Sequence, residues 1–142
     1  MLKANFAGPI THEPRHSLLP LILIYGAASL VHFLHNGVYL SSYPNMPAWL
    51  TPGGVLISWL VVAATGAVGY WLLRKGWTAV GLAAIALYAV FGFASLDHYA
   101  VAPVSAHSWA MNATIVIEVI TASVLLIAVA RVAVRRTEIS SI

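Results

Sequence analysis

The chain has 142 residues, of which 61% are hydrophobic and only 8% are charged, and its formal net charge is +3. Soluble globular proteins carry about 25% charged residues. The composition therefore excludes an ordinary soluble domain and indicates an integral membrane protein. There is no cysteine, which excludes disulfides, thiolate metal sites and thiol catalysis.

Four hydrophobic segments follow one another along the chain, over residues 18–40, 55–73, 77–96 and 113–134. Each is close to the roughly 20 residues that a helix needs to cross the hydrocarbon core of a bilayer. We therefore predict an all-α integral membrane protein, a four-transmembrane-helix antiparallel bundle. It forms a single domain over residues 18–136, between an N-terminal tail of residues 1–17 and a C-terminal tail of residues 137–142.

The basic residues predict the orientation of this bundle. Every Lys and Arg lies in the N-terminal tail, in the second joint or at the C-terminal end: Lys3, Arg15, Arg74, Lys75, Arg131, Arg135 and Arg136. With four spans, these three places share one side of the membrane. The positive-inside rule makes that side cytoplasmic. We expect both termini in the cytoplasm of a bacterium, the protein in its inner (plasma) membrane, and the first and third joints facing outward.

Polar residues form a stripe along the outer half of the first segment. His32, His35, Asn36 and Tyr39 are separated by three, four and seven residues, and helical residues at this spacing share a face. Such a stripe on an apolar helix needs polar partners from neighbouring helices. We expect those partners at the matching ends of the third and fourth segments.

The remaining ionisable groups of the outer half are Asp97, His98, His107 and Glu118. A carboxylate near the middle of a spanning helix costs roughly 2.5–3.5 kcal/mol on insertion scales, so it normally faces the interior and has a partner. His32 lies about 12 Å inward from Leu40, and Glu118 lies about 10 Å inward from Met111, at 1.5 Å per residue. At such similar depths the two side chains meet if their helices are neighbours.

Imidazoles and carboxylates are the usual protein ligands of transition metals when thiolates are absent. We predict a Zn, Fe, Cu or Mn site near the outer face. Its ligands are drawn from His32, His35, His98, His107, Asp97 and Glu118, with Asn36, Tyr39 and Asn112 around them. If the site is catalytic, it acts on a lipophilic substrate, and Glu118 serves as a ligand or as a general base.

Three other interpretations stay open. In the first, the chain is an accessory subunit of a larger membrane complex, or a homo-oligomer, whose buried His, Glu and Asn side chains only order its interior. In the second, His32 or His35 ligates haem or chlorophyll. The third is a proton or ion path. No pattern for nucleic-acid binding is present.

Two short motif matches are rejected. Residues 12–16 read His-Glu-Pro-Arg-His and match the zinc-protease pattern H-E-x-x-H. That pattern needs one helix to carry both histidines on one face, and Pro14 disfavours helix in the residue before it. Residues 112–114 match a glycosylation sequon, but we interpret Asn112 as a helix-capping residue.

Overall fold

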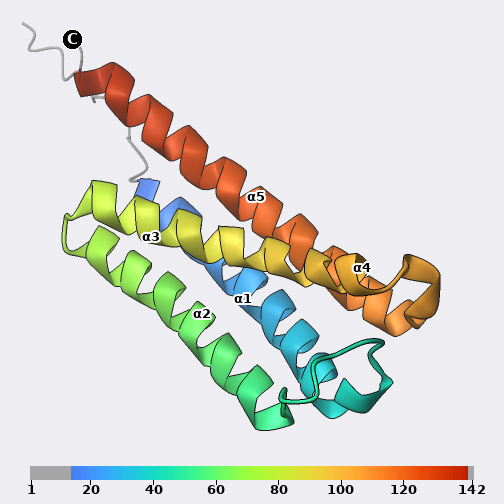
Figure 1. Cartoon of the computed structure of the whole chain (residues 1–142). Helices are drawn as coiled ribbons and strands as arrows, with labels where there is room; N and C mark the ends of the chain where they lie inside the picture. Colours follow the sequence, from blue (N-terminus) through green and yellow to red (C-terminus); the bar gives the residue numbers. More distant parts are fainter. Residues whose placement is uncertain (1–13, 141–142) are drawn as a thin grey trace, which may run out of the picture.

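The computed structural model of the chain describes residues 14–140, with side chains over residues 18–136. The regular elements of this part are all helical (Figure 1). They are the α-helices α1 (Pro14–Val38), α2 (Pro52–Arg74), α3 (Thr78–Phe91), α4 (Asp97–Val101) and α5 (Trp109–Ser140), and the 3₁₀ turns η1 (Leu40–Ser42), η2 (Gly92–Leu96) and η3 (Val104–Ala106).

Four helical stretches are long and apolar enough to cross a membrane: Leu18–Val38, Pro52–Arg74, Thr78–Val101 and Trp109–Arg136. The prediction of four apolar helices is confirmed. The third stretch is not one α-helix, because α3 tightens into the 3₁₀ turn η2 before continuing as α4. This stretch therefore reaches Val101, five residues beyond its predicted end.

The other helix ends also differ from the predicted ones, and one difference has a clear cause. α5 begins at Trp109, four residues before the predicted start. The Ser108 hydroxyl oxygen accepts a hydrogen bond from the Met111 backbone N–H at 3.2 Å, as expected of an N-cap serine. Ser108, and not Asn112, is therefore the capping residue of this helix.

At its N-terminal end, α1 begins at Pro14, so residues 14–17 of the predicted tail are helical. Proline suits a first helical turn because its missing N–H has no partner there in any case. His12 and Glu13 of the rejected motif lie outside the described residues.

Figure 1 shows the four long helices side by side. α1 contacts α2 and α5, and α3 contacts the same two helices. We call the end of the molecule that holds residues 39–51 and 102–108 the histidine end. The opposite end, which holds the α2–α3 joint and the last turns of α5, is called the arginine end.

The interior differs between the two ends. Toward the arginine end the buried residues are apolar, and they include Leu18, Ile22, Leu73, Leu82, Ile85, Leu125 and Val129. Toward the histidine end the buried residues include Ser29, His32, Asn36, Ser95, His98, His107 and Glu118. The buried tyrosines Tyr25 and Tyr88 belong to the apolar core cluster, and their ring centroids lie 4.5 Å apart.

Glycines allow the helices to approach closely. A Cβ atom on Gly66 of α2 would lie 2.6 Å from the Tyr88 ring, so only glycine leaves room for that ring. A Cβ atom on Gly92 would lie 2.6 Å from the Ala122 Cβ and 2.8 Å from the Tyr25 hydroxyl. Gly92 begins η2, so this contact brings the 3₁₀ turn against α5.

Candidate functional site

The site begins with one face of α1. Ser29, His32 and Asn36 follow one another at helical spacing and are only 0%, 2% and 7% exposed. Apolar residues cover the rest of this helix, with Val31, Leu34 and Val38 on its exposed side. Of the polar stripe predicted for this helix, His32 and Asn36 therefore point into the molecule, whereas Tyr39 does not.

His32 has a defined pattern of contacts. Its Nδ1 lies 3.2 Å from the Thr114 hydroxyl oxygen, and that hydroxyl donates its own proton to the Met111 carbonyl at 3.0 Å. The Thr114 oxygen must then accept from His32, so the imidazole carries its proton on Nδ1. The lone pair on Nε2 faces inward, 3.7 Å from Glu118 Oε2.

Asn36 joins two histidines that are far apart in the sequence. Its Nδ2 lies 3.1 Å from His32 Nε2 and 3.0 Å from His98 Nε2. The amide nitrogen has two N–H groups, so both imidazole nitrogens accept and neither carries a proton. The Asn36 Oδ1 is buried and has no hydrogen-bond partner.

His107 contributes a third imidazole whose Nε2 carries no proton. Its Nδ1 lies 3.0 Å from the Pro103 carbonyl oxygen, which can only accept, so the proton again sits on Nδ1. Its Nε2 is buried without a partner. Asn112 fixes this segment, because its Nδ2 donates to the Val104 and His107 carbonyls at 3.2 and 3.3 Å.

Tyr43 closes the site at the histidine end. It is only 4% exposed, although it belongs to the joint between α1 and α2. Its hydroxyl lies 2.8 Å from His35 Nδ1, and its ring centroid lies 4.9 Å from that of His98. Burial raises the pKa of Tyr43 to about 12, so its phenol stays protonated at neutral pH.

Glu118 lies deepest among the ionisable groups and is 1% exposed. The side chains of Ser29 and Ser95 lie beside its carboxyl group, but Oε2 has no hydrogen-bond partner. One turn closer to the arginine end from Ser29, Tyr25 begins the core cluster. We call the buried polar side chains from Tyr43 inward to Glu118 the polar column. Among the described residues, this column ends against apolar packing.

The structure brings together five of the predicted residues: His32, Asn36, His98, His107 and Glu118. Ring centroids are 5.5 Å apart for His32 and His98, and 6.1 Å apart for His98 and His107. In the arrangement described for residues 18–136, no three His, Asp or Glu side chains gather closely enough to hold a metal ion.

Three predicted residues lie elsewhere. Asp97 is exposed, because consecutive helical residues point about 100° apart and its neighbour His98 takes the inward position. Tyr39 is 51% exposed, and its ring centroid lies 4.7 Å from that of His35. His35 is half-buried at the edge of the group and faces Tyr43.

Sequence reasoning did not include Tyr43 and Ser95 among the site residues. Tyr43 lies in a joint without helical periodicity, so no spacing rule places it. Ser95 lies where the α-helical register changes to 3₁₀. Its hydroxyl donates to the Gly92 carbonyl at 2.8 Å. Only the fold places these two side chains beside the histidines and Glu118.

Comparison with known protein families, with curated proteins and with solved structures finds no match for this chain. The site is therefore interpreted from its own geometry.

Proposed function

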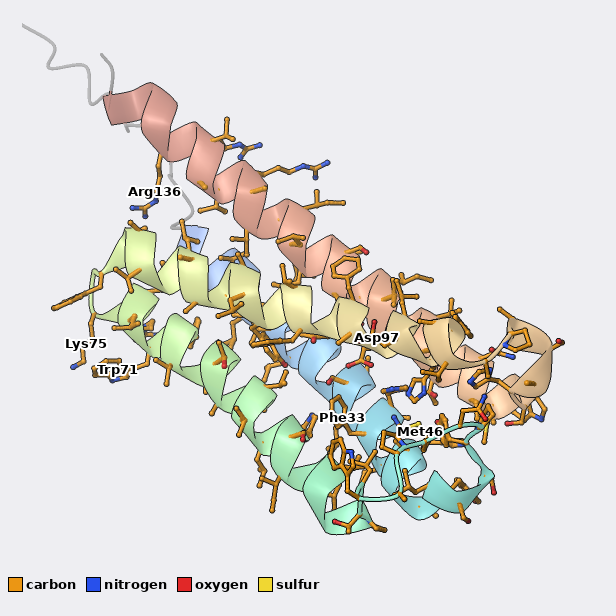
Figure 2. The ribbon with its side chains drawn as sticks, viewed as in Figure 1. Phe33, Met46, Trp71, Lys75, Asp97 and Arg136 are labelled. Carbon is orange, nitrogen blue, oxygen red and sulfur yellow. The ribbon has the colours of Figure 1, made fainter. Side chains whose placement is uncertain are left out.

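We propose that the chain is an antiparallel bundle in a bacterial inner membrane, with both termini cytoplasmic and the histidine end facing outward. All Lys and Arg residues between positions 18 and 136 lie toward the arginine end, and such an excess of basic residues is typical of the cytoplasmic side. Figure 2 labels Trp71, Lys75 and Arg136 at that end. A reporter fused after Ile142 should read as cytoplasmic. A periplasmic readout contradicts this orientation.

We further propose that the histidine end binds a divalent transition metal, Zn, Fe, Cu or Mn. The ligands are His32, His98 and Glu118, with His107 as a fourth. The observation that carries this proposal is that two of the proposed ligand atoms, His107 Nε2 and Glu118 Oε2, are buried without a hydrogen-bond partner. Buried polar groups in folded proteins are normally paired.

The protonation pattern supports the same ligands. His32 and His107 each donate Nδ1–H to an oxygen of the protein. This is the usual arrangement around a metal-bound imidazole, and it leaves the Nε2 lone pair to bind the metal. Metal entry requires two local changes. The ligand side chains must move closer together, because no three of them gather closely enough in the described arrangement. The Asn36 amide, which now lies between His32 and His98, must turn away so that both Nε2 atoms are free.

A metal held there would supply a Lewis acid near the outer side of the membrane. Glu118 would then serve as a ligand or as a general base toward a lipophilic substrate. A bound metal cation would also account for the buried position of the Glu118 carboxylate, because a nearby positive charge favours the ionised form that burial disfavours.

The test is metal analysis of the protein purified without chelator after growth with each metal. Wild type should contain close to one metal per chain, and His32→Ala and Glu118→Gln should lose most of it. His35→Ala is the matched control, since His35 faces Tyr43 and should keep the metal. Wild type without metal, or both site variants with full metal, would overturn the proposal.

One observation favours a second function, that of an accessory subunit or homo-oligomer with a purely structural network. Asn36 already donates to His32 and His98, and a network of this kind orders a helix bundle without any ligand. Isolation in mild detergent separates the two functions. A metal-free chain that co-purifies with a larger complex supports the second. The visible spectrum of the same preparation reports haem or chlorophyll.

A further inference from the structure

A cavity of about 330 Å³ opens beside the histidine group. It lies between α1, the α1–α2 joint and the α3–α4 stretch, and Asn36 and His98 line it on the side of the buried site. Figure 2 shows Phe33, Met46 and Asp97, which also line it, near the histidine end. The volume lies at the lower end of the range for small-molecule sites, which is about 300–1,000 Å³.

The polar groups that line this cavity leave mostly acceptors for a ligand. Asp97 brings a carboxyl group, and no Lys or Arg occurs between residues 76 and 130 or between residues 16 and 73. The Ser58 hydroxyl and the Asn45 Nδ2 already donate to backbone carbonyls, at 2.9 and 2.8 Å. Asn36 is 93% buried, spends both N–H groups on histidines, and keeps Oδ1 without a partner.

Apolar side chains form the rest of the wall. Phe33 is half-buried there, and Met46, Leu50, Val55 and Val101 continue the apolar surface. An aromatic ring attracts a cation placed over its face. Asp97, Phe33 and Asn36, whose buried Oδ1 has no hydrogen-bond partner, lie around one apolar cavity. A carboxylate, an aromatic ring and an amide oxygen are complementary to a positively charged group on a hydrophobic body.

We propose that this cavity binds a small organic primary ammonium ion with an apolar substituent. Asp97 provides the opposite charge, Asn36 Oδ1 accepts one N–H, and Phe33 with Met46 covers the apolar part. The binding requires no metal, and it uses the Asn36 amide in the position that metal entry would displace, so it is tested on metal-free protein. An ammonium of this chemistry is carried either by a free amine or by the head group of an aminophospholipid.

The experiment uses the full chain, treated with chelator, in phosphatidylcholine nanodiscs, whose head groups offer no N–H. Binding of 2-(4-fluorophenyl)ethylamine is followed by fluorine NMR, with empty nanodiscs as the correction for partitioning. Wild type should bind this amine saturably and at least about 10-fold more tightly than 2-(4-fluorophenyl)ethanol, because a hydrogen bond to a charged group is worth this factor.

Asp97→Asn keeps the shape of the side chain and removes its charge, so it should weaken amine binding about 10-fold and leave alcohol binding unchanged. Trp109→Phe, at an exposed position outside the cavity, should bind like wild type. Equal amine binding by wild type and Asp97→Asn overturns the proposal, as does the absence of saturable amine binding by folded wild type. Loss of amine binding only in nanodiscs with phosphatidylethanolamine identifies the lipid head group as the competing ammonium.

Discussion

Asn36→Asp tests the hydrogen-bond pattern on which the site is built. The substitution keeps the size of the side chain but replaces the NH₂ group with oxygen. His32 Nε2 and His98 Nε2, which accept from Asn36 at 3.1 and 3.0 Å, then face an acceptor. If the new carboxyl group is protonated, one of the two hydrogen bonds is still lost, which costs about 0.6–1.7 kcal/mol between membrane helices.

If the new carboxyl group is ionised, it lies buried in a spanning helix and costs about 2.5–3.5 kcal/mol. We therefore expect Asn36→Asp to lower the free energy of unfolding by about 1–3 kcal/mol. Reversible unfolding in mixed micelles measures this value. Ser41→Asp is the control for an added carboxyl group, because Ser41 is exposed and the variant should lose less than about 0.5 kcal/mol. Equal losses in the two variants would refute the proposed donor pattern.

Three further predictions concern stability. The raised pKa of Tyr43, about 12 against an ordinary 10.0, means that the folded chain holds this proton more tightly than the unfolded chain. Its contribution to the free energy of unfolding is thus complete below pH 10 and is lost as the pH rises through 12. The prediction is contradicted if tyrosinate absorbance shows a step near pH 10 that Tyr43→Phe removes. Gly66→Ala should cost about 1–3 kcal/mol through the clash with Tyr88, whereas Gly53→Ala, with no atom within 4 Å of the new Cβ, should cost nothing; equal effects would argue against the clash. Ser108→Ala should lower the free energy of unfolding by about 0.5–2 kcal/mol through the lost N-cap, and an unchanged unfolding curve would show that the cap contributes nothing.

The spans were predictable because hydrophobic length is encoded locally. A stretch of about 20 apolar residues identifies a spanning helix without any knowledge of its neighbours. The 3₁₀ turn in the third span was not predictable, since it lies where Gly92 meets Ala122 and Tyr25. That contact joins residues from three helices, and no local pattern in the sequence announces it.

The site was partly predictable for a related reason. Helical spacing placed His32 and Asn36 on one face, although Tyr39 of the same predicted stripe is exposed. Equal depth predicted that His32 and Glu118 meet, and their Nε2 and Oε2 atoms lie 3.7 Å apart. Asp97 is exposed while its neighbour His98 is buried, and helical spacing anticipates such a difference, because consecutive residues point about 100° apart. Tyr43 comes from a joint, where neither rule applies.

The asymmetric interior leads to a last prediction, on transport. The polar column runs from Tyr43 to Glu118, and the described interior beyond Tyr25 and Tyr88 is apolar. A proton or ion crossing the chain would have to pass this apolar part without hydrogen-bonding groups, where a charge is strongly disfavoured. The site should therefore exchange with one side of the membrane only. Proteoliposomes loaded with a pH-sensitive dye and given a proton gradient should leak no faster than protein-free liposomes. Faster leakage that Glu118→Gln abolishes would show that the column is a conducting path, and the metal site would then have to be reinterpreted as part of it.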